Sequence, residues 1–188
     1  MKNTKKIIDT KTIVLIGILS ALSYVLMFIP KIPGIIPAAP WLDIDFSDVP
    51  ALLASVGISP ITGVLVVAIK NILHLTATST GAVGELSNFI CGASLVLSCG
   101  LATKYLFKKT INKIKLLVTL PIACVAQLIG AILGNYFLMI PLYGIQATAK
   151  EYILGAVIPF NLIKDVLVCI VFYFIYVFVY PKIQKRLY

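Results

Sequence analysis

The stretch Leu116–Ile140, LLVTLPIACVAQLIGAILGNYFLMI, contains no charged residue and is almost entirely apolar. A helix of this length, at about 1.5 Å per residue, crosses the ~30 Å hydrocarbon core of a bilayer. A helix on the surface of a soluble protein would instead carry a polar face. The stretch therefore predicts a membrane-spanning helix.

The rest of the 188-residue chain has the same character. It is 60% apolar and only 12% charged, and its mean hydropathy is +1.04. A soluble domain carries about 25% charged residues. We predict an all-α, multi-pass membrane protein with one integral membrane domain over residues 1–188. Its six transmembrane helices are expected at about residues 13–29, 48–56, 61–75, 85–107, 116–140 and 156–180.

Proline residues set several of these expected boundaries. Pro141 ends the fifth span, residues 142–155 form a loop, and Pro159 lies in the first turn of the sixth span. Between the first two spans, prolines favour a stiff loop, and Leu42–Phe46 alternates apolar and acidic residues as an extended chain does. Ser47-Asp48 then provides the cap of a helix that is too short to cross a bilayer upright.

Basic residues cluster in the amino-terminal segment, in the loop between the fourth and fifth spans, and in the carboxy-terminal tail. The positive-inside rule therefore places the N- and C-termini in the cytoplasm. Because these charges flank apolar segments, they favour anionic lipid headgroups as partners and argue against nucleic acid.

Ionisable residues inside the predicted spans are the best pointers to function, because each costs about 2.5–3.5 kcal/mol on insertion. Lys70, Lys164 and Asp165 are such residues. One interpretation is an ion pair between Lys70 and Asp165 that holds two helices together. Adjacent helical residues do not face each other, so Asp165 does not easily neutralise Lys164. Lys164 is then available for a ligand.

Other polar side chains fall at a similar depth, near the outer end of the spans. Asn161 lies one turn before Lys164, Asn135 lies near the end of the fifth span, and Glu85 lies at the start of the fourth. Gln127 is deeper, and we interpret it as a bridge between helices. Together these groups suit a flat, partly apolar solute with a hydrogen-bonding rim.

Other features are compatible with this picture or with simpler explanations. Trp41, in the proline-rich loop, either covers the ligand or anchors the chain at the membrane interface. The cysteines lie in apolar segments and are interpreted as free, buried residues: Cys91, Cys99, Cys124 and Cys169. The sequence has no phosphate-binding loop, no nucleophile motif and no cluster of metal ligands, so we predict neither an enzyme nor a metal site.

Small residues on the first span allow close approach of another helix. Gly17 and Ala21 are four residues apart, with Ser20 beside them. This surface is either an internal contact or the docking surface for another membrane subunit.

Four segments resemble one known family. They are APWLDIDFSDVPAL at 39–52, KNILH at 70–74, STGAVGELSNF at 79–89 and PFNLIK at 159–164. Taken together they resemble the riboflavin-specific substrate-binding subunits (S components) of energy-coupling factor (ECF) transporters. The resemblance extends over nearly the whole chain.

The resemblance implies a six-helix protein of a bacterial plasma membrane that captures riboflavin at the outer side as transported ligand, not cofactor. It also implies a transmembrane coupling protein and two cytoplasmic ATPase subunits as partners. The riboflavin contacts it implies are Asn161, Lys164, Asn135, Glu85, Ala39, Pro40, Trp41 and Leu42, and the coupling-protein contact is Gly17, Ser20 and Ala21. The alternatives are an S component for another vitamin, an integral membrane enzyme that uses Glu85 or Lys70 with Asp165, and an independent channel or exchanger.

Overall fold

The computed structural model describes residues 9–29, 31–37, 39, 42–78, 80–106, 112–145 and 147–179. This part of the chain is helical and has no strand, apart from one isolated antiparallel bridge between Ile32 and Ile44. The all-α prediction is confirmed. The bridge lies in the loop after the first helix, where the alternating sequence predicted extended chain.

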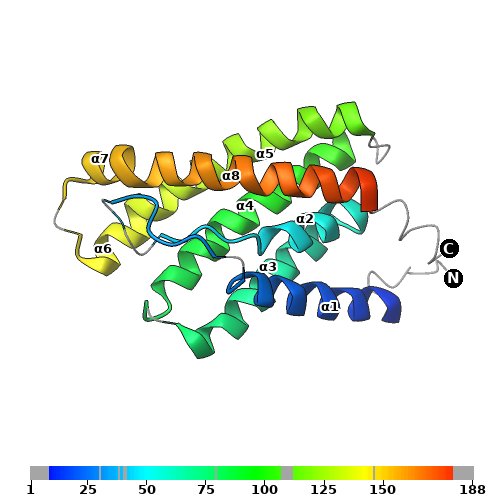
Figure 1. The fold of residues 1–188 in the computed structure, drawn as a ribbon, viewed down its shortest axis with the longest axis horizontal. Coiled ribbons are helices and arrows are strands. Elements are labelled where there is room, and N and C mark those ends of the chain that lie inside the picture. The colour runs from blue at the N-terminus through cyan, green and yellow to red at the C-terminus, as the bar shows by residue number, and fades with distance from the viewer. Residues whose placement is uncertain are drawn as a thin grey trace, which may run out of the picture.

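The helical segments form an elongated bundle (Figure 1). The first ones are α1 (Thr10–Leu26), α2 (Asp48–Gly57), α3 (Pro60–His74, continued by a 3-10 turn at Leu75–Ala77) and α4 (Val83–Tyr105). A continuous segment then comprises α5 (Lys113–Gly134), a π-helical turn (Asn135–Met139) and α6 (Ile140–Tyr143). The last segment comprises α7 (Ala149–Tyr152), a π-helical turn (Ile153–Val157), α8 (Ile158–Phe174) and a final π-helical turn (Ile175–Val179).

Four of these segments are long and apolar enough to cross a membrane: Pro60–Ala77, Val83–Tyr105, Lys113–Tyr143 and Ala149–Val179. α1 and α2 are apolar but shorter. A helix is thus present in each of the six ranges expected from the sequence. That all six cross the bilayer stays a prediction.

The prolines expected to bound the last two spans lie inside continuous helices instead. Pro141 and Pro159 each lie two residues after the end of a π-helical turn. A proline ring clashes with the carbonyl group four residues earlier, here that of Phe137 or Gly155. Both of these residues lie within the wider π-helical turns, which give the ring room without ending the helix.

The start of the last segment is therefore earlier than expected, and the predicted loop at 142–155 is wrong. Thr148 caps α7: its side chain accepts a hydrogen bond from the backbone N–H of Glu151, and the Glu151 carboxylate accepts one from the backbone N–H of Thr148. This reciprocal pair is a capping box. The T-x-x-E spacing was visible in the sequence.

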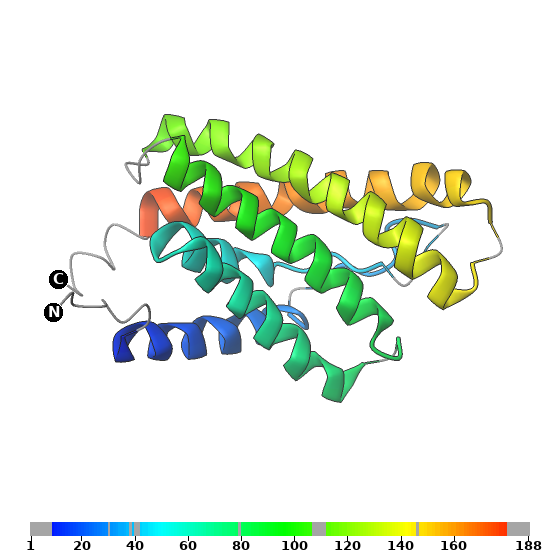
Figure 2. The same cartoon turned by 180° about the vertical axis from the view of Figure 1, so that it is seen from behind.

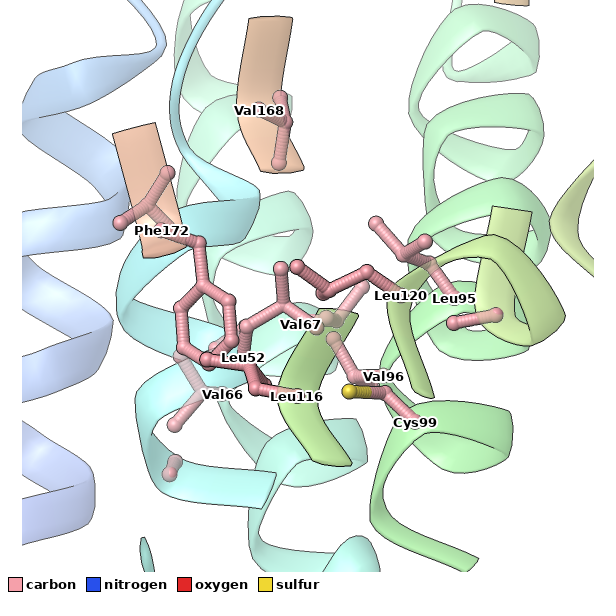
Figure 3. Packing of buried hydrophobic residues seen from close by; sticks show 14 of the residues in the cluster. Leu52, Val66, Val67, Leu95, Val96, Cys99, Leu116, Leu120, Val168 and Phe172 are labelled. Carbon is pink, nitrogen blue, oxygen red and sulfur yellow. The ribbon is translucent and has the colours of Figure 1, made fainter. Parts of the chain in front are cut away.

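The main apolar core lies where α2 is enclosed by longer helices. Figure 3 shows Leu52 of α2 among side chains of α3, α4, α5 and α8, including Val66, Leu95, Leu116 and Phe172. All five side chains are almost completely removed from solvent. Because α2 packs against α1, α3, α4 and α8, its nearly three turns are held by packing rather than by their own length.

The two ends of the bundle differ. The start of α1, the end of α4, the start of α5 and the end of the last segment lie at one end (Figures 1 and 2). The loop between α1 and α2, together with α6 and α7, lies at the other. There a second apolar cluster packs the loop residues Ile36, Ala39 and Ile44 against Ala131, Tyr152 and Phe160. The loop is thereby fixed as a wall of the bundle's end.

Candidate functional site

A cavity of about 230 Å³ lies at the loop end of the bundle. Five of the residues predicted for the site line it: Leu42 from the loop, Glu85 from α4, Asn135 from the π-helical turn after α5, and Asn161 and Lys164 from α8. Apolar walls come from residues such as Met139, Val157 and Phe160. The structure thus brings side chains from distant parts of the sequence together around one space.

The other loop residues predicted for the site are not part of this lining. Ala39 is completely buried in the second apolar cluster, because its small side chain packs against the helices rather than the cavity. Pro40 and Trp41 lie outside the described residues. Their predicted contacts with a ligand stay predictions.

Lys164 has protein partners, so it is less free for a ligand than the sequence indicated. Its Nζ donates a hydrogen bond to Asp45 Oδ2 at 3.0 Å and lies 4.0 Å from Asp48 Oδ2. From the sequence, only Asp165, its neighbour on the same helix, was considered as an ionic partner of Lys164. The acidic partners come instead from the loop and from the first turn of α2.

Lys70 also pairs with this segment, so the proposed pair with Asp165 is wrong. Its Nζ lies 2.6 Å from Asp48 Oδ1 and also donates to Ser47 Oγ. Ser47 and Asp48 begin α2, and α2 packs against α3, which carries Lys70. Two lysines therefore face two aspartates, and the charges of these four groups balance.

Asp45 stays ionised in this network. Burial disfavours its charged form, but the ammonium groups of Lys164 and Lys70, with a hydrogen bond from Ser47, hold the pKa of this loop carboxyl well below its usual value. Its charge therefore persists at neutral pH. The ion pair with Lys164 consequently ties the loop to α8 beside the cavity.

The amide side chains of α5 and α8 form a chain of hydrogen bonds. Asn161 Nδ2 donates to the carbonyl oxygen of Val157 at 2.7 Å, and Gln127 Nε2 donates to Asn161 Oδ1 at 2.7 Å. Gln127 therefore bridges two helices, as the sequence interpretation expected, but it also lines the cavity. Asn135 Nδ2 donates to the carbonyl oxygen of Ala131 at 2.8 Å.

Glu85 also lines the cavity and is held by two neighbours. His74 Nδ1 lies 2.8 Å from Glu85 Oε1, and Thr80 Oγ1 donates to Oε2 at 3.1 Å. The ring of Phe28 lies 5.2 Å from the His74 ring, centre to centre. His74 was not among the residues predicted for the site, although it ends α3 and Glu85 lies in the first turn of α4. Helices joined by so short a connection bring such ends together.

This arrangement suits binding rather than catalysis. The cavity lining combines hydrogen-bonding side chains with apolar ones such as Met139, Val157 and Phe160, which fits a ligand with apolar and polar parts. Within the described ranges, no group of three or more His, Cys, Asp or Glu side chains is placed to hold a metal ion.

The small residues of α1 separate onto two faces. Gly17 and Ala21 are exposed, and nothing lies within 4 Å of the position that a Cβ atom would take at Gly17. Ser20 is 1% exposed and faces the bundle. The outward surface is therefore formed by Gly17 and Ala21, and Ser20 is corrected to an inward position.

Comparison with known proteins identifies the family of the chain. The model of the family "ECF transporter, substrate-specific component" matches residues 11–176. The chain belongs to this family. It is therefore an integral membrane component of a transporter and not an enzyme.

Two relatives of this S component have names that state a substrate. The riboflavin transporter RibU of Staphylococcus aureus (strain TCH60) is 37% identical over 176 residues, which are 89% of each chain. The riboflavin transporter FmnP of Bacillus subtilis (strain 168) is 32% identical over 188 residues, covering 94% of this chain and 95% of the relative.

A solved structure has the same fold. It is described as "Structure and mechanism of the S component of a bacterial ECF transporter", is 35% identical to this S component, and superposes with a TM-score of 0.77. The match covers 94% of this chain and 97% of that chain. The resemblance seen in the four sequence segments is confirmed.

Proposed function

We propose that this S component binds riboflavin from outside a bacterial cell and hands it to the ATP-driven part of an ECF transporter. The cavity lined by Glu85, Asn135, Asn161 and Lys164 carries the proposal. The two relatives match most of the chain, and their names support riboflavin rather than another vitamin as the ligand.

The chemistry of riboflavin matches the groups around the cavity. The vitamin is uncharged and has an apolar xylene edge, a pyrimidine-like edge with two carbonyls and one N–H, and a ribityl chain of hydroxyls. Amides and an ammonium group suit the pyrimidine edge, and the Glu85 carboxylate accepts from ribityl hydroxyls. An uncharged ligand also avoids the large cost of desolvating a charge.

The orientation and partners follow from the ends of the bundle. The start of α1, the end of α4 and the start of α5 lie at the end opposite the cavity. These helix ends carry Lys11, Lys104, Lys113 and Lys115, which supports a cytoplasmic position for that end and for both termini. We infer six crossings by one membrane domain, with the cavity opening outward. A transmembrane coupling protein, docked on the Gly17 and Ala21 face of α1, and two cytoplasmic ATPases would complete the transporter.

Titration of the purified protein in detergent with riboflavin, followed by the quenching of flavin fluorescence, tests the proposal. We expect saturable binding of one flavin per chain, and its loss in Asn161→Ala and Lys164→Ala. Asn71→Ala is the matched control, because Asn71 is an equally buried amide that does not line the cavity. Thermal unfolding of each variant shows whether it is folded.

Two outcomes would contradict the proposal. One is absence of flavin binding by the folded wild-type protein, above all if it binds another vitamin. The other is uptake of riboflavin into liposomes that contain this chain alone, which would favour an independent transporter.

A further inference from the structure

Gln127 carries a hydrogen-bond acceptor that the protein leaves unused. The residue is 2% exposed and lines the cavity, and its Oε1 atom has no hydrogen-bond partner in the described structure. A buried acceptor without a partner is costly, because it has lost its water and gained nothing in exchange. Such an atom in the wall of a ligand cavity points to a donor on the ligand.

The direction of the Gln127 amide is fixed by its neighbours. The carbonyl oxygen of Val157 can only accept, so Asn161 must present its Nδ2 to Val157 and its Oδ1 to Gln127. Gln127 must then present Nε2 to Asn161, which leaves Oε1 for the cavity. The Gln127 amide cannot turn over without replacing its bond to Asn161 by a contact between two oxygens, so this part of the wall offers an acceptor.

The groups around this acceptor are donors. Lys164 also lines the cavity, and its ammonium group has three N–H donors, of which one bonds Asp45. Asn161 Nδ2 has a second N–H beyond the one that bonds Val157. An acceptor on Gln127, together with donors on Asn161 and Lys164 in the same cavity lining, matches a ligand edge that carries one N–H and two carbonyls.

The depth of Gln127 also selects one end of the ligand. It lies eight residues before Asn135 on the same continuous helical segment, about 12 Å deeper at 1.5 Å per residue. Glu85 lies in the first turn of α4, at the end of the bundle that carries the loop. We place the ring end of the vitamin at Gln127, because its N–H and carbonyls match the amides there, and the ribityl chain near Glu85.

We propose that Gln127 is a specificity-determining residue, whose Oε1 accepts a hydrogen bond from the ring N–H of the bound flavin. This proposal rests on the proposed function, because riboflavin supplies that N–H between two carbonyls. Asn161 then has a second task besides contacting the ligand: it positions the Gln127 amide.

The test compares riboflavin with 3-methylriboflavin, in which a methyl group replaces the hydrogen on that ring nitrogen. We expect the wild type to bind 3-methylriboflavin about tenfold to a hundredfold more weakly, the cost of one buried hydrogen bond. In Gln127→Met, whose side chain has similar length and no amide, riboflavin itself should bind about tenfold more weakly. The two flavins should then bind this variant with nearly equal affinity.

Asn71→Leu is the control for loss of a buried amide. Asn71 Oδ1 also has no partner among the described residues, but Asn71 lies away from the cavity lining. This variant should keep the wild-type ratio of affinities for the two flavins. Gln127→Leu serves as a second variant if Gln127→Met does not fold.

An unchanged ratio in the folded Gln127 variants would overturn the inference while leaving riboflavin binding intact. In the wild type alone, equal affinity for the two flavins would overturn it whatever the variants do. If the wild type binds neither flavin, the proposed function fails instead.

Discussion

Lys70 is fully buried, although its side chain ends in an ammonium group. Taking an ammonium group out of water costs several kcal/mol, which only close partners offset. Asp48 and Ser47 supply them. The pair joins the start of α2 to α3, and the same Asp48 lies 4.0 Å from Lys164.

Lys70→Met should therefore destabilise the protein strongly. Asp48 would retain only Lys164, at 4.0 Å, and breaking a buried pair from one side costs about 3–5 kcal/mol. Thermal unfolding of the purified protein in detergent measures the loss. Lys150→Met is the control, because Lys150 is exposed on α7. Equal unfolding temperatures for the two variants would show that the pair contributes little.

Some features of single residues were predictable from the sequence, and others were not. The cost of charge in a membrane was enough to single out Lys70 and Lys164. Their partners were not predictable, because Asp45 and Lys164 are 119 residues apart and several acids could serve each lysine. The unused oxygen of Gln127 was also invisible, since only the geometry of Asn161 fixes its direction.

Helix α2 depends on close contact with its neighbours. Gly63 of α3 faces it so closely that an added Cβ atom would lie 2.6 Å from Cβ of Ser55 and 2.9 Å from the carbonyl oxygen of Ala51. Both contacts are shorter than van der Waals separation. The α2 backbone therefore packs where α3 has no side chain.

Gly63→Ala should force α2 away from α3 and cost about 1–3 kcal/mol of stability. Because α2 begins with Asp48, the shift should also weaken flavin binding. Gly17→Ala is the matched control, since nothing lies within 4 Å of the added methyl group and alanine favours the helix. Comparison of their unfolding temperatures decides the matter, and no difference between them would contradict the packing argument.

Element boundaries were the weakest part of the sequence prediction. Apolar length locates each helix, but a proline normally interrupts an α-helix, so the sequence predicts a helix end at Pro141 and a helix start just before Pro159. The local backbone widens instead, and no residue pattern in the sequence announced this. The capping box at Thr148 and Glu151 was the available signal for the earlier start of the last segment.

At the scale of the whole molecule, the cavity and the exposed small-residue face of α1 lie at separate places. Gly17 and Ala21 face outward on α1, whereas the cavity lies among the loop, α4, α5 and α8. Ligand binding and attachment to the transporter should therefore be separable by mutation.

Gly17→Trp should abolish co-purification with the membrane-bound coupling subunit, because a large ring prevents close helix approach. Flavin binding by the isolated variant should stay within about twofold of the wild type, a free-energy change of about 0.4 kcal/mol. Leu133→Trp is the control, as Leu133 is 52% exposed on α5. Normal co-purification of Gly17→Trp would remove α1 as the docking surface.

The general architecture was predictable because hydropathy and charge distribution are global properties of the chain. The cavity was predictable in part, since the polar residues near one end of the spans converge as expected. Its fine structure was not, because the loop that carries Asp45 is positioned by the second apolar cluster and not by any local preference of its own sequence.

The widened turns in the two longest helical segments have one more consequence. A π-helical turn takes up about one residue more than an α-helical turn, so the azimuth of every later side chain rotates by about 100°. In both segments this phase change occurs beside the ligand chamber. An insertion or deletion of one residue at such a turn would rotate all later side chains of the segment about the helix axis. A change of length at these turns, and not only a substitution, would therefore change which side chains face the cavity.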